Sequence, residues 1–168
     1  MKNKILVPLC FLFFAACNSS KEGLQLKEST HNNGQYEIAT WKGFSEAVIN
    51  YTFDDGCANQ FDVAIPMFDQ YGFQLTIYLI SNWVPEDKWE IIKQAISNGH
   101  EMGSHTVTHP SLAELSLEDQ RKEFLNSRKA IEERTGIKKC HTIAYPYCIH
   151  PDLEVCSEYY IAGRDCRG

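Results

Sequence analysis

AVINYTF (residues 47–53) runs directly into DDG (residues 54–56), and the rest of the chain repeats the pattern that starts here. Seven residues rich in β-forming side chains predict a strand, and the Asp-Asp-Gly triplet predicts the turn that ends it. An amphipathic segment follows, and the same order of apolar strand and amphipathic helix recurs downstream. Strands that alternate with helices indicate an α/β fold with a parallel sheet or barrel.

The periodicity downstream places four helices and four further strands. Gly72 and Gly99 are expected to end the first two helices, and Ser116 is expected to begin the third as the first residue of a capping box. Pro66 lies inside the first helix, where it should bend or end that helix. We expect helices near residues 61–71, 85–98, 116–135 and 151–158, and strands near residues 73–80, 100–104, 141–146 and 159–162.

Acidic and histidine residues follow two of the expected strands at their C-terminal ends. Asp55 follows the first strand, and His105 and His109 follow the third. The carboxyl ends of parallel strands are where α/β proteins build their sites. One carboxylate and two imidazoles form a three-ligand set for a divalent metal with one position left open for water, and Asp54 would act as a base on that water. This combination indicates metal-assisted hydrolysis.

Each motif also has a plain structural interpretation. An Asp-Gly pair is a common turn signal, so Asp54 and Asp55 could serve only the turn. His105 and His109 could be one surface and one core histidine, whereas their four-residue spacing on a helical turn would direct both toward one metal. Thr106 stands where a zincin-type metalloprotease has glutamate, which disfavours that class of enzyme.

Together the motifs resemble those of the polysaccharide deacetylase family, the NodB-homology domain of carbohydrate esterase family four. Thr52–Gly56 is similar to the family's T-F-D-D-G motif, His105–His109 to its H-[ST]-x-x-H motif, and Ala144–Cys148 to part of its third motif. The resemblance implies an α/β fold, an incomplete (β/α) barrel of the polysaccharide deacetylase type. It also implies hydrolysis of acetyl groups on a polysaccharide.

The same resemblance implies a role for each matching residue. Asp54 would be the general base, and the backbone N–H of Tyr147 would help to hold the oxyanion. Pro146 and Tyr147 would contact the substrate, although both also suit a plain loop after a strand. Three residues would bind a divalent metal, commonly zinc in this family: Asp55, His105 and His109.

Two residues depart from the family's third motif. Ala144 stands where many members carry an arginine that orients the base. A subset with an A-Y-P-Y-G version also lacks that arginine and includes deacetylases of poly-N-acetylglucosamine. The similarity to this subset favours an N-acetyl over an O-acetyl group, and so a carbon–nitrogen bond other than a peptide bond. Cys148 replaces the usual glycine, so the loop is expected to differ in conformation.

The family's barrel normally continues with more strands and a late leucine-histidine motif, whose histidine protonates the leaving group. His141 and His150 do not stand at that place and are expected to be structural or exposed. We therefore expect residues 44–168 to form a deacetylase domain that lacks its C-terminal part. Two alternatives stay open: a catalytically inactive carbohydrate-binding lipoprotein and a non-functional truncated gene product. Asp54 favours the enzyme, because sugar binding alone needs no base.

The first 17 residues resemble a bacterial lipoprotein signal. Two lysines precede an apolar run at residues 5–16 that is too short to span a bilayer, and small residues then lead to Cys17. We expect Cys17 to carry a lipid, residues 18–43 to form a polar tether and N-terminal extension, and the protein to be anchored to a membrane of a bacterial cell envelope. An ordinary secretory signal, with Cys17 incidental, is the alternative.

Composition excludes one class of partner and leaves the cysteines undecided. The 168 residues carry a formal net charge of −6, and no basic stretch is present, which argues against nucleic acid. Of the seven cysteines, Cys10 and Cys17 belong to the signal, which leaves five. An odd number means that at least one thiol stays free or pairs outside the chain, and no disulfide can be assigned.

Overall fold

A computed structural model describes residues 46–166, and the residues from Asn50 onward form one compact unit. Its five strands are all parallel and lie side by side in the order of the sequence. Doubly wound sheets reverse their strand order at one point, whereas barrels keep it sequential. The prediction of an α/β fold of the incomplete-barrel type is therefore confirmed. The strands are β1 (Thr52–Phe53), β2 (Thr76–Leu79), β3 (Glu101–Ser104), β4 (Thr142–Ala144) and β5 (Ala162–Arg164).

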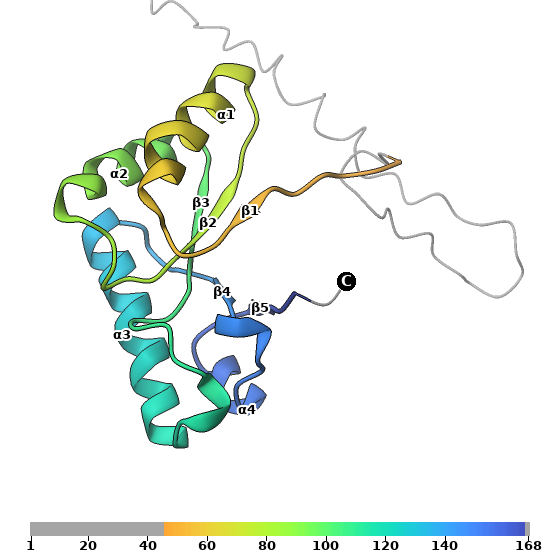
Figure 1. Ribbon diagram of the computed structural model, residues 1–168, viewed down its shortest axis with the longest axis vertical. Coiled ribbons are helices and arrows are strands. Elements are labelled where there is room, and N and C mark those ends of the chain that lie inside the picture. The colour runs from red at the N-terminus through yellow and green to blue at the C-terminus, as the bar shows by residue number, and fades with distance from the viewer. Residues whose placement is uncertain (1–45, 167–168) are drawn as a thin grey trace, which may run out of the picture. The chain divides into compact units, whose positions relative to one another are not determined.

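The helices connect successive strands, and α1, α2 and α3 run along one side of the sheet (Figure 1). Pro66 lies in the first turn of α1, and a π-helical turn at Gln60–Ala64 leads directly into this helix. The helical run therefore changes its hydrogen-bonding pattern next to the proline, which cannot donate a backbone N–H. Gly72 ends this helix in the left-handed conformation, with φ 69°. The helices are α1 (Ile65–Tyr71), α2 (Trp89–Ser97), α3 (Leu117–Thr135) and α4 (Leu153–Ser157), with 3-10 turns at Glu86–Lys88, Leu112–Glu114 and Pro146–Cys148.

The core fills the space between the sheet and these helices. Ile77 and Leu79 of β2 and Ile143 of β4 are fully buried, as are Phe124 and Ile131 of α3. Fully burying one such side chain stabilises the fold by about 1.5–3 kcal/mol. Ser116 caps α3 as predicted, because its hydroxyl accepts a hydrogen bond from the N–H of Asp119 at 3.2 Å. Among the described residues, no helix combines the length and the apolar character needed to cross a membrane.

Two strands differ from the sequence prediction in their limits. β1 is short because β2 begins only at Thr76, so the residues before Thr52 have no strand to pair with, and Val48 and Ile49 are exposed. β5 lies later than predicted. Tyr160 packs against α3 instead of joining the sheet, and its hydroxyl donates to the carbonyl oxygen of Phe124 at 2.9 Å. β5 therefore begins only at Ala162 and runs to Arg164.

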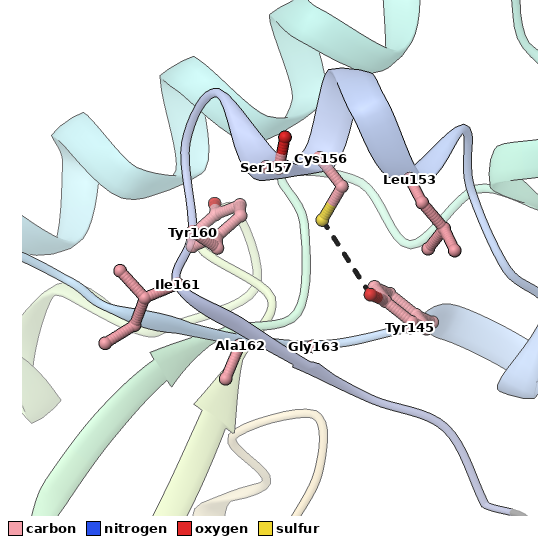
Figure 2. A pocket seen from close by; sticks show the side chains of 8 residues that line it. All are labelled: Tyr145, Leu153, Cys156, Ser157, Tyr160, Ile161, Ala162 and Gly163. Carbon is pink, nitrogen blue, oxygen red and sulfur yellow. Dashed lines mark hydrogen bonds between the residues drawn. The ribbon is translucent and has the colours of Figure 1, made fainter.

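Tyr145 lines a small pocket between α4 and β5 (Figure 2). The hydroxyl of Tyr145 lies 3.8 Å from the thiol of Cys156, and burial raises the pKa of both groups. Gly163 permits this arrangement, because a Cβ atom there would lie 1.9 Å from the Tyr145 hydroxyl oxygen. The pocket contains none of the predicted site residues. Its lining is Tyr145, Leu153, Cys156, Ser157, Tyr160, Ile161, Ala162 and Gly163.

Candidate metal centre

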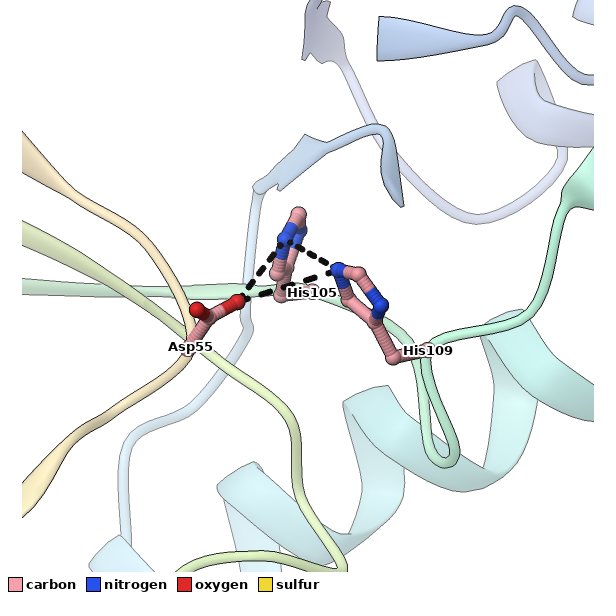
Figure 3. Close-up of side chains that lie close together, drawn as sticks. All are labelled: Asp55, His105 and His109. Atoms are coloured by element: carbon pink, nitrogen blue, oxygen red, sulfur yellow. Dashed lines mark hydrogen bonds and ion pairs between the residues drawn. The ribbon is translucent and has the colours of Figure 1, made fainter. Parts of the chain in front are cut away.

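Three loops meet at the carboxyl end of the sheet, and each carries part of the predicted site. Asp55 follows β1, His105 and His109 follow β3, and Tyr147 follows β4. Figure 3 shows that the side chains of Asp55, His105 and His109 converge. The ligand atoms of these three residues lie within 4.8 Å of one another.

The distances between the three ligand atoms fit a single metal ion. His105 Nε2 lies 3.2 Å from His109 Nε2, and Asp55 Oδ1 lies 3.5 and 3.7 Å from these two nitrogens. Ligand atoms about 2.0–2.1 Å from a tetrahedral zinc ion would be separated by about 3.3–3.4 Å. Two imidazoles and one carboxylate are also a donor set that catalytic zinc sites use. The residues present therefore fit a divalent metal.

Hydrogen bonding and burial prepare His105 to act as a ligand. Its Nδ1 lies 2.8 Å from the carbonyl oxygen of Ala144, which can only accept, so Nδ1 carries the proton and Nε2 is left with its lone pair. Burial lowers the pKa of His105, against the opposing effects of the Ala144 carbonyl and the Asp54 carboxylate. The neutral form, which is the form that binds metals, is thereby favoured.

The segment that carries His105 and His109 is a loop, so the prediction of a helical turn is wrong. Residues 105–110 contain no helix. Thr106 and His109 instead have positive φ values of 69° and 63°. The buried hydroxyl of Thr106 accepts from the N–H of His109 at 3.0 Å, and the hydroxyl of Ser104 accepts from the N–H of Thr106 at 3.1 Å. These bonds hold a backbone path that a helix would not produce.

Glu123 of α3 holds the middle of this histidine loop. One carboxylate oxygen accepts from the N–H groups of Val107 at 2.7 Å and of Thr108 at 3.1 Å. The other accepts from the hydroxyl of Thr108 at 2.8 Å. Hydrogen bonds to a charged acceptor are stronger than neutral ones, so Glu123 restrains the segment between the two histidines. Glu123 could not be recognised from the sequence, because only the fold brings α3 beside the loop.

Replacing Glu123 by alanine is expected to weaken zinc binding about 10-fold, at the lower end of the effect of groups that orient metal ligands. The reason is that the segment from Val107 to Thr108 loses three hydrogen bonds, so His109 is less restrained. Competitive zinc titration measures the effect. Glu133→Ala, an exposed residue on the same helix, is the control. An affinity equal in the two variants would show that the loop does not need Glu123.

Backbone strain is concentrated in the three motifs. Among residues 46–166, the non-glycine residues with positive φ are Asp55, Thr106, His109, Tyr147 and Cys148. Such conformations cost free energy, about 1–3 kcal/mol each, and they gather where a site requires them. Every one of these residues lies in one of the three sequence motifs. The strained residues therefore lie in the same region as the three candidate metal ligands.

The third-motif loop brings Tyr147 beside the histidines. The ring of Tyr147 is exposed, and its centroid lies 4.6 Å from that of His109. Tyr147 follows Pro146 in the 3-10 turn at Pro146–Cys148 and has a positive φ of 57°. The oxyanion contact of the Tyr147 backbone N–H stays a prediction. Cys148 forms a disulfide with Cys166, a pairing that could not be assigned from the cysteine count.

Asp54 lies beside the ligands and has a partner that the sequence analysis did not name. Arg164, the last residue of β5, donates through Nη2 to Asp54 Oδ1. The carbonyl oxygen of Asp54 accepts from the side-chain amide of Gln60 at 2.5 Å. The exposed ring of Trp83 is a further unpredicted feature of the site, with its centroid 5.8 Å from that of His109.

The two remaining candidate histidines take no part in the metal cluster, as predicted. His141 is exposed and precedes β4, at the end of the strand opposite the site. His150 lies 2.6 Å from a carboxylate oxygen of Asp165 and ties two loops together. The predicted signal at residues 1–17, the lipidated Cys17 and the tether at 18–43 lie outside the described residues and stay predictions.

A sequential parallel sheet with a carboxylate and two imidazoles at its carboxyl edge defines an α/β protein of the barrel type with a candidate metal centre. Comparison with known proteins identifies the family within this class. The sequence profile of the family "polysaccharide deacetylase" matches residues 42–156, which is more than half of the chain. The chain therefore belongs to the polysaccharide deacetylase family.

Several relatives share part of the sequence. A gellan lyase of Bacillus sp is 28% identical over 89% of this chain and 6% of its own length. The chitooligosaccharide deacetylase of Sinorhizobium fredii is 28% identical over 60% of this chain and 47% of its own. The peptidoglycan-N-acetylglucosamine deacetylase of Bacillus cereus is 26% identical over 61% of this chain and 37% of its own. The match thus spans less than half the length of each of these relatives.

The fold has solved counterparts. The deacetylase PplD of Streptococcus pyogenes, solved in complex with acetate, superposes with a TM-score of 0.63 at 24% identity. The superposition covers 68% of this chain and 53% of that one. At this level of identity the likeness supports the fold, and the function must be argued from the site.

Proposed function

We propose that the protein removes acetyl groups from a polysaccharide with the help of a divalent metal, zinc, held by Asp55, His105 and His109. One observation carries the proposal: three ligand atoms from two separate loops lie 3.2 to 3.7 Å apart, at the spacing of ligands on one ion. A bound divalent cation would lower the pKa of water and polarise the acetyl carbonyl group.

The residues around the ligands supply the other functions that hydrolysis needs. Asp54 accepts the proton of the attacking water through the carboxylate oxygen that Arg164 leaves free. The N–H of Tyr147 donates to the oxygen of the acetyl group as negative charge develops on it. These two groups come from different loops, after β1 and after β4, so the acetyl carbon would lie between them.

An amino sugar carrying an N-acetyl group is the proposed substrate. Two of the relatives are named for deacetylation of chitooligosaccharide and of peptidoglycan N-acetylglucosamine. The exposed rings of Trp83 and Tyr147 lie beside His109 and present apolar faces next to the proposed metal. Sugar rings carry apolar faces as well as hydroxyl groups, so aromatic residues at the rim suit a polysaccharide.

Acetate release from the purified full chain tests this function. The chain is stripped with a chelator, reloaded with zinc, and incubated with N-acetylglucosamine oligomers or with O-acetylated xylan. We expect acetate from the N-acetyl substrate only, no release after chelation, and recovery on adding zinc. Oligomer binding without acetate release would instead support the carbohydrate-binding alternative. Release from the O-acetyl substrate alone would contradict the proposed linkage.

A further inference from the structure

The side chain of Arg164 reaches from the last residue of β5 to the carboxylate of Asp54. Its Nη2 donates to Asp54 Oδ1, and its Nη1 donates to the carbonyl oxygen of Asp165 at 3.2 Å. The guanidinium carbon also lies 5.2 Å from the centre of the Tyr78 ring, within range of a cation–π interaction. Arg164 is therefore held from several sides while it contacts Asp54.

The register of the sheet explains how an arginine comes to this position. Arg164 pairs directly with Ala144 on the neighbouring strand. Ala144 is the residue that replaces the base-orienting arginine expected in the third motif. Because paired residues of parallel strands lie at the same level of the sheet, an arginine one strand further along can reach the same end of the sheet.

The residues that follow Arg164 fasten the end of β5 to the third-motif loop. A carboxylate oxygen of Asp165 lies 2.6 Å from Nε2 of His150. Cys166 forms the disulfide with Cys148, the neighbour of Tyr147. Three successive residues, 164 to 166, thus bind to Asp54, His150 and Cys148. The covalent link and the hydrogen bond between His150 and Asp165 hold the strand end in the place from which Arg164 reaches Asp54.

The contact has a chemical consequence for a base. A guanidinium group that occupies one carboxylate oxygen fixes the carboxylate plane and leaves the second oxygen for another partner. A base works best when its free oxygen is held within hydrogen-bonding distance of the proton that it takes. Half of the Asp54 carboxylate is held in this way by a residue outside the three sequence motifs.

We propose that Arg164 is the positioning residue of Asp54 and replaces, from β5, the arginine that is absent at position 144. Its kinetic effect rests on the proposed deacetylase function, whereas the contact with Asp54 does not. Two measurements therefore separate a failure of this inference from a failure of the proposed function.

The kinetic measurement compares Arg164→Ala with the parent chain on an N-acetylglucosamine oligomer. We expect kcat to fall about 10- to 100-fold, as when a reacting group is misplaced, with KM and zinc affinity unchanged. Guanidinium ion added to the assay should restore part of the rate. Arg121→Ala is the control, because it removes an arginine that pairs with another carboxylate, that of Glu158, at 2.8 Å. An unchanged kcat would overturn the inference, and so would a loss that guanidinium does not restore and that accompanies loss of zinc.

The second measurement is independent of catalysis. Thermal unfolding is compared for the parent, Arg164→Ala, Asp54→Asn and the double variant. The effect of Arg164→Ala on Tm should be smaller in the Asp54→Asn background, because the charged partner is already removed. This coupling would support the positioning contact even if the chain released no acetate. Equal shifts in the two backgrounds would show that Arg164 does not act on Asp54.

Discussion

Asp54→Asn is expected to lower kcat for acetate release by about 10² to 10⁴-fold, the usual contribution of a general base. Asparagine has nearly the same shape as aspartate, and its carbonyl oxygen can still accept from Arg164. It cannot take a proton from water, because the amide is not a base at neutral pH. Zinc affinity should stay within about 3-fold of the parent, since Asp54 is not one of the three proposed ligands and a 3-fold change is below 1 kcal/mol.

The assay is steady-state acetate release together with zinc titration of the same preparation. Asp62→Asn is a suitable control, because Asp62 is an acid outside the three motifs that pairs with Lys88 at 2.6 Å. If Asp54→Asn kept the parent rate, another group would have to be the base. If it lost zinc as well, Asp54 would belong to the metal site and not to the proton transfer.

Asp55→Asn is expected to weaken zinc binding by more than about 100-fold, because removal of groups that merely orient ligands already costs 10- to 100-fold. Asparagine is preferred over alanine at this position. Asp55 has φ 77°, and asparagine adopts left-handed conformations more readily than most residues. The variant therefore removes the charge of the ligand with little added backbone strain.

Competitive titration against a zinc indicator measures this change. A second readout is the rise in Tm that zinc produces, which should be present in the parent and absent in Asp55→Asn at the same zinc concentration. Zinc affinity and zinc stabilisation that were equal in the two proteins would contradict the proposed ligand set. Asp54→Asn serves as the matched control, because it makes the same chemical change one residue away.

The ligands could be predicted from sequence because each follows a strongly patterned strand. Parallel strands bring their carboxyl ends to one edge, so Asp55 after β1 and His105 after β3 had to lie at the same end of the sheet. This prediction does not depend on how many residues separate Asp55 from His105 along the chain. The fold class followed from the same alternation of strands and helices.

The supporting residues could not be predicted in this way. Asp54 and Arg164 are 110 positions apart, and their contact depends on the register of β5. The strong β propensity of Tyr159 and Tyr160 predicts a strand that ends at residue 162. Tyr160 instead packs against α3, so the strand begins only at Ala162. The contact of Glu123 depends likewise on how α3 packs. The disulfide could not be assigned because cysteine counting leaves the pairing open.

The conformation of the histidine loop also lay beyond sequence reasoning. A spacing of four residues suits one turn of a helix, and the residue types at positions 105–109 do not forbid it. The loop conformation depends on backbone N–H groups that donate to the side chains of Ser104, Thr106 and Glu123. The hydroxyl of Ser104 also lies 2.8 Å from that of Ser127. Such networks become visible only when the packing is known.

X-ray absorption at the zinc edge, on the purified chain loaded with one equivalent of zinc, tests the metal centre most directly. We predict nitrogen and oxygen ligands at about 2.0–2.1 Å, including two imidazoles. The imidazole signal should fall when His109 is replaced by alanine. A sulfur ligand at about 2.3 Å would mean that a cysteine such as the exposed Cys57 holds the ion. That result, or zinc that does not bind in a one-to-one ratio, would contradict the Asp55, His105 and His109 site.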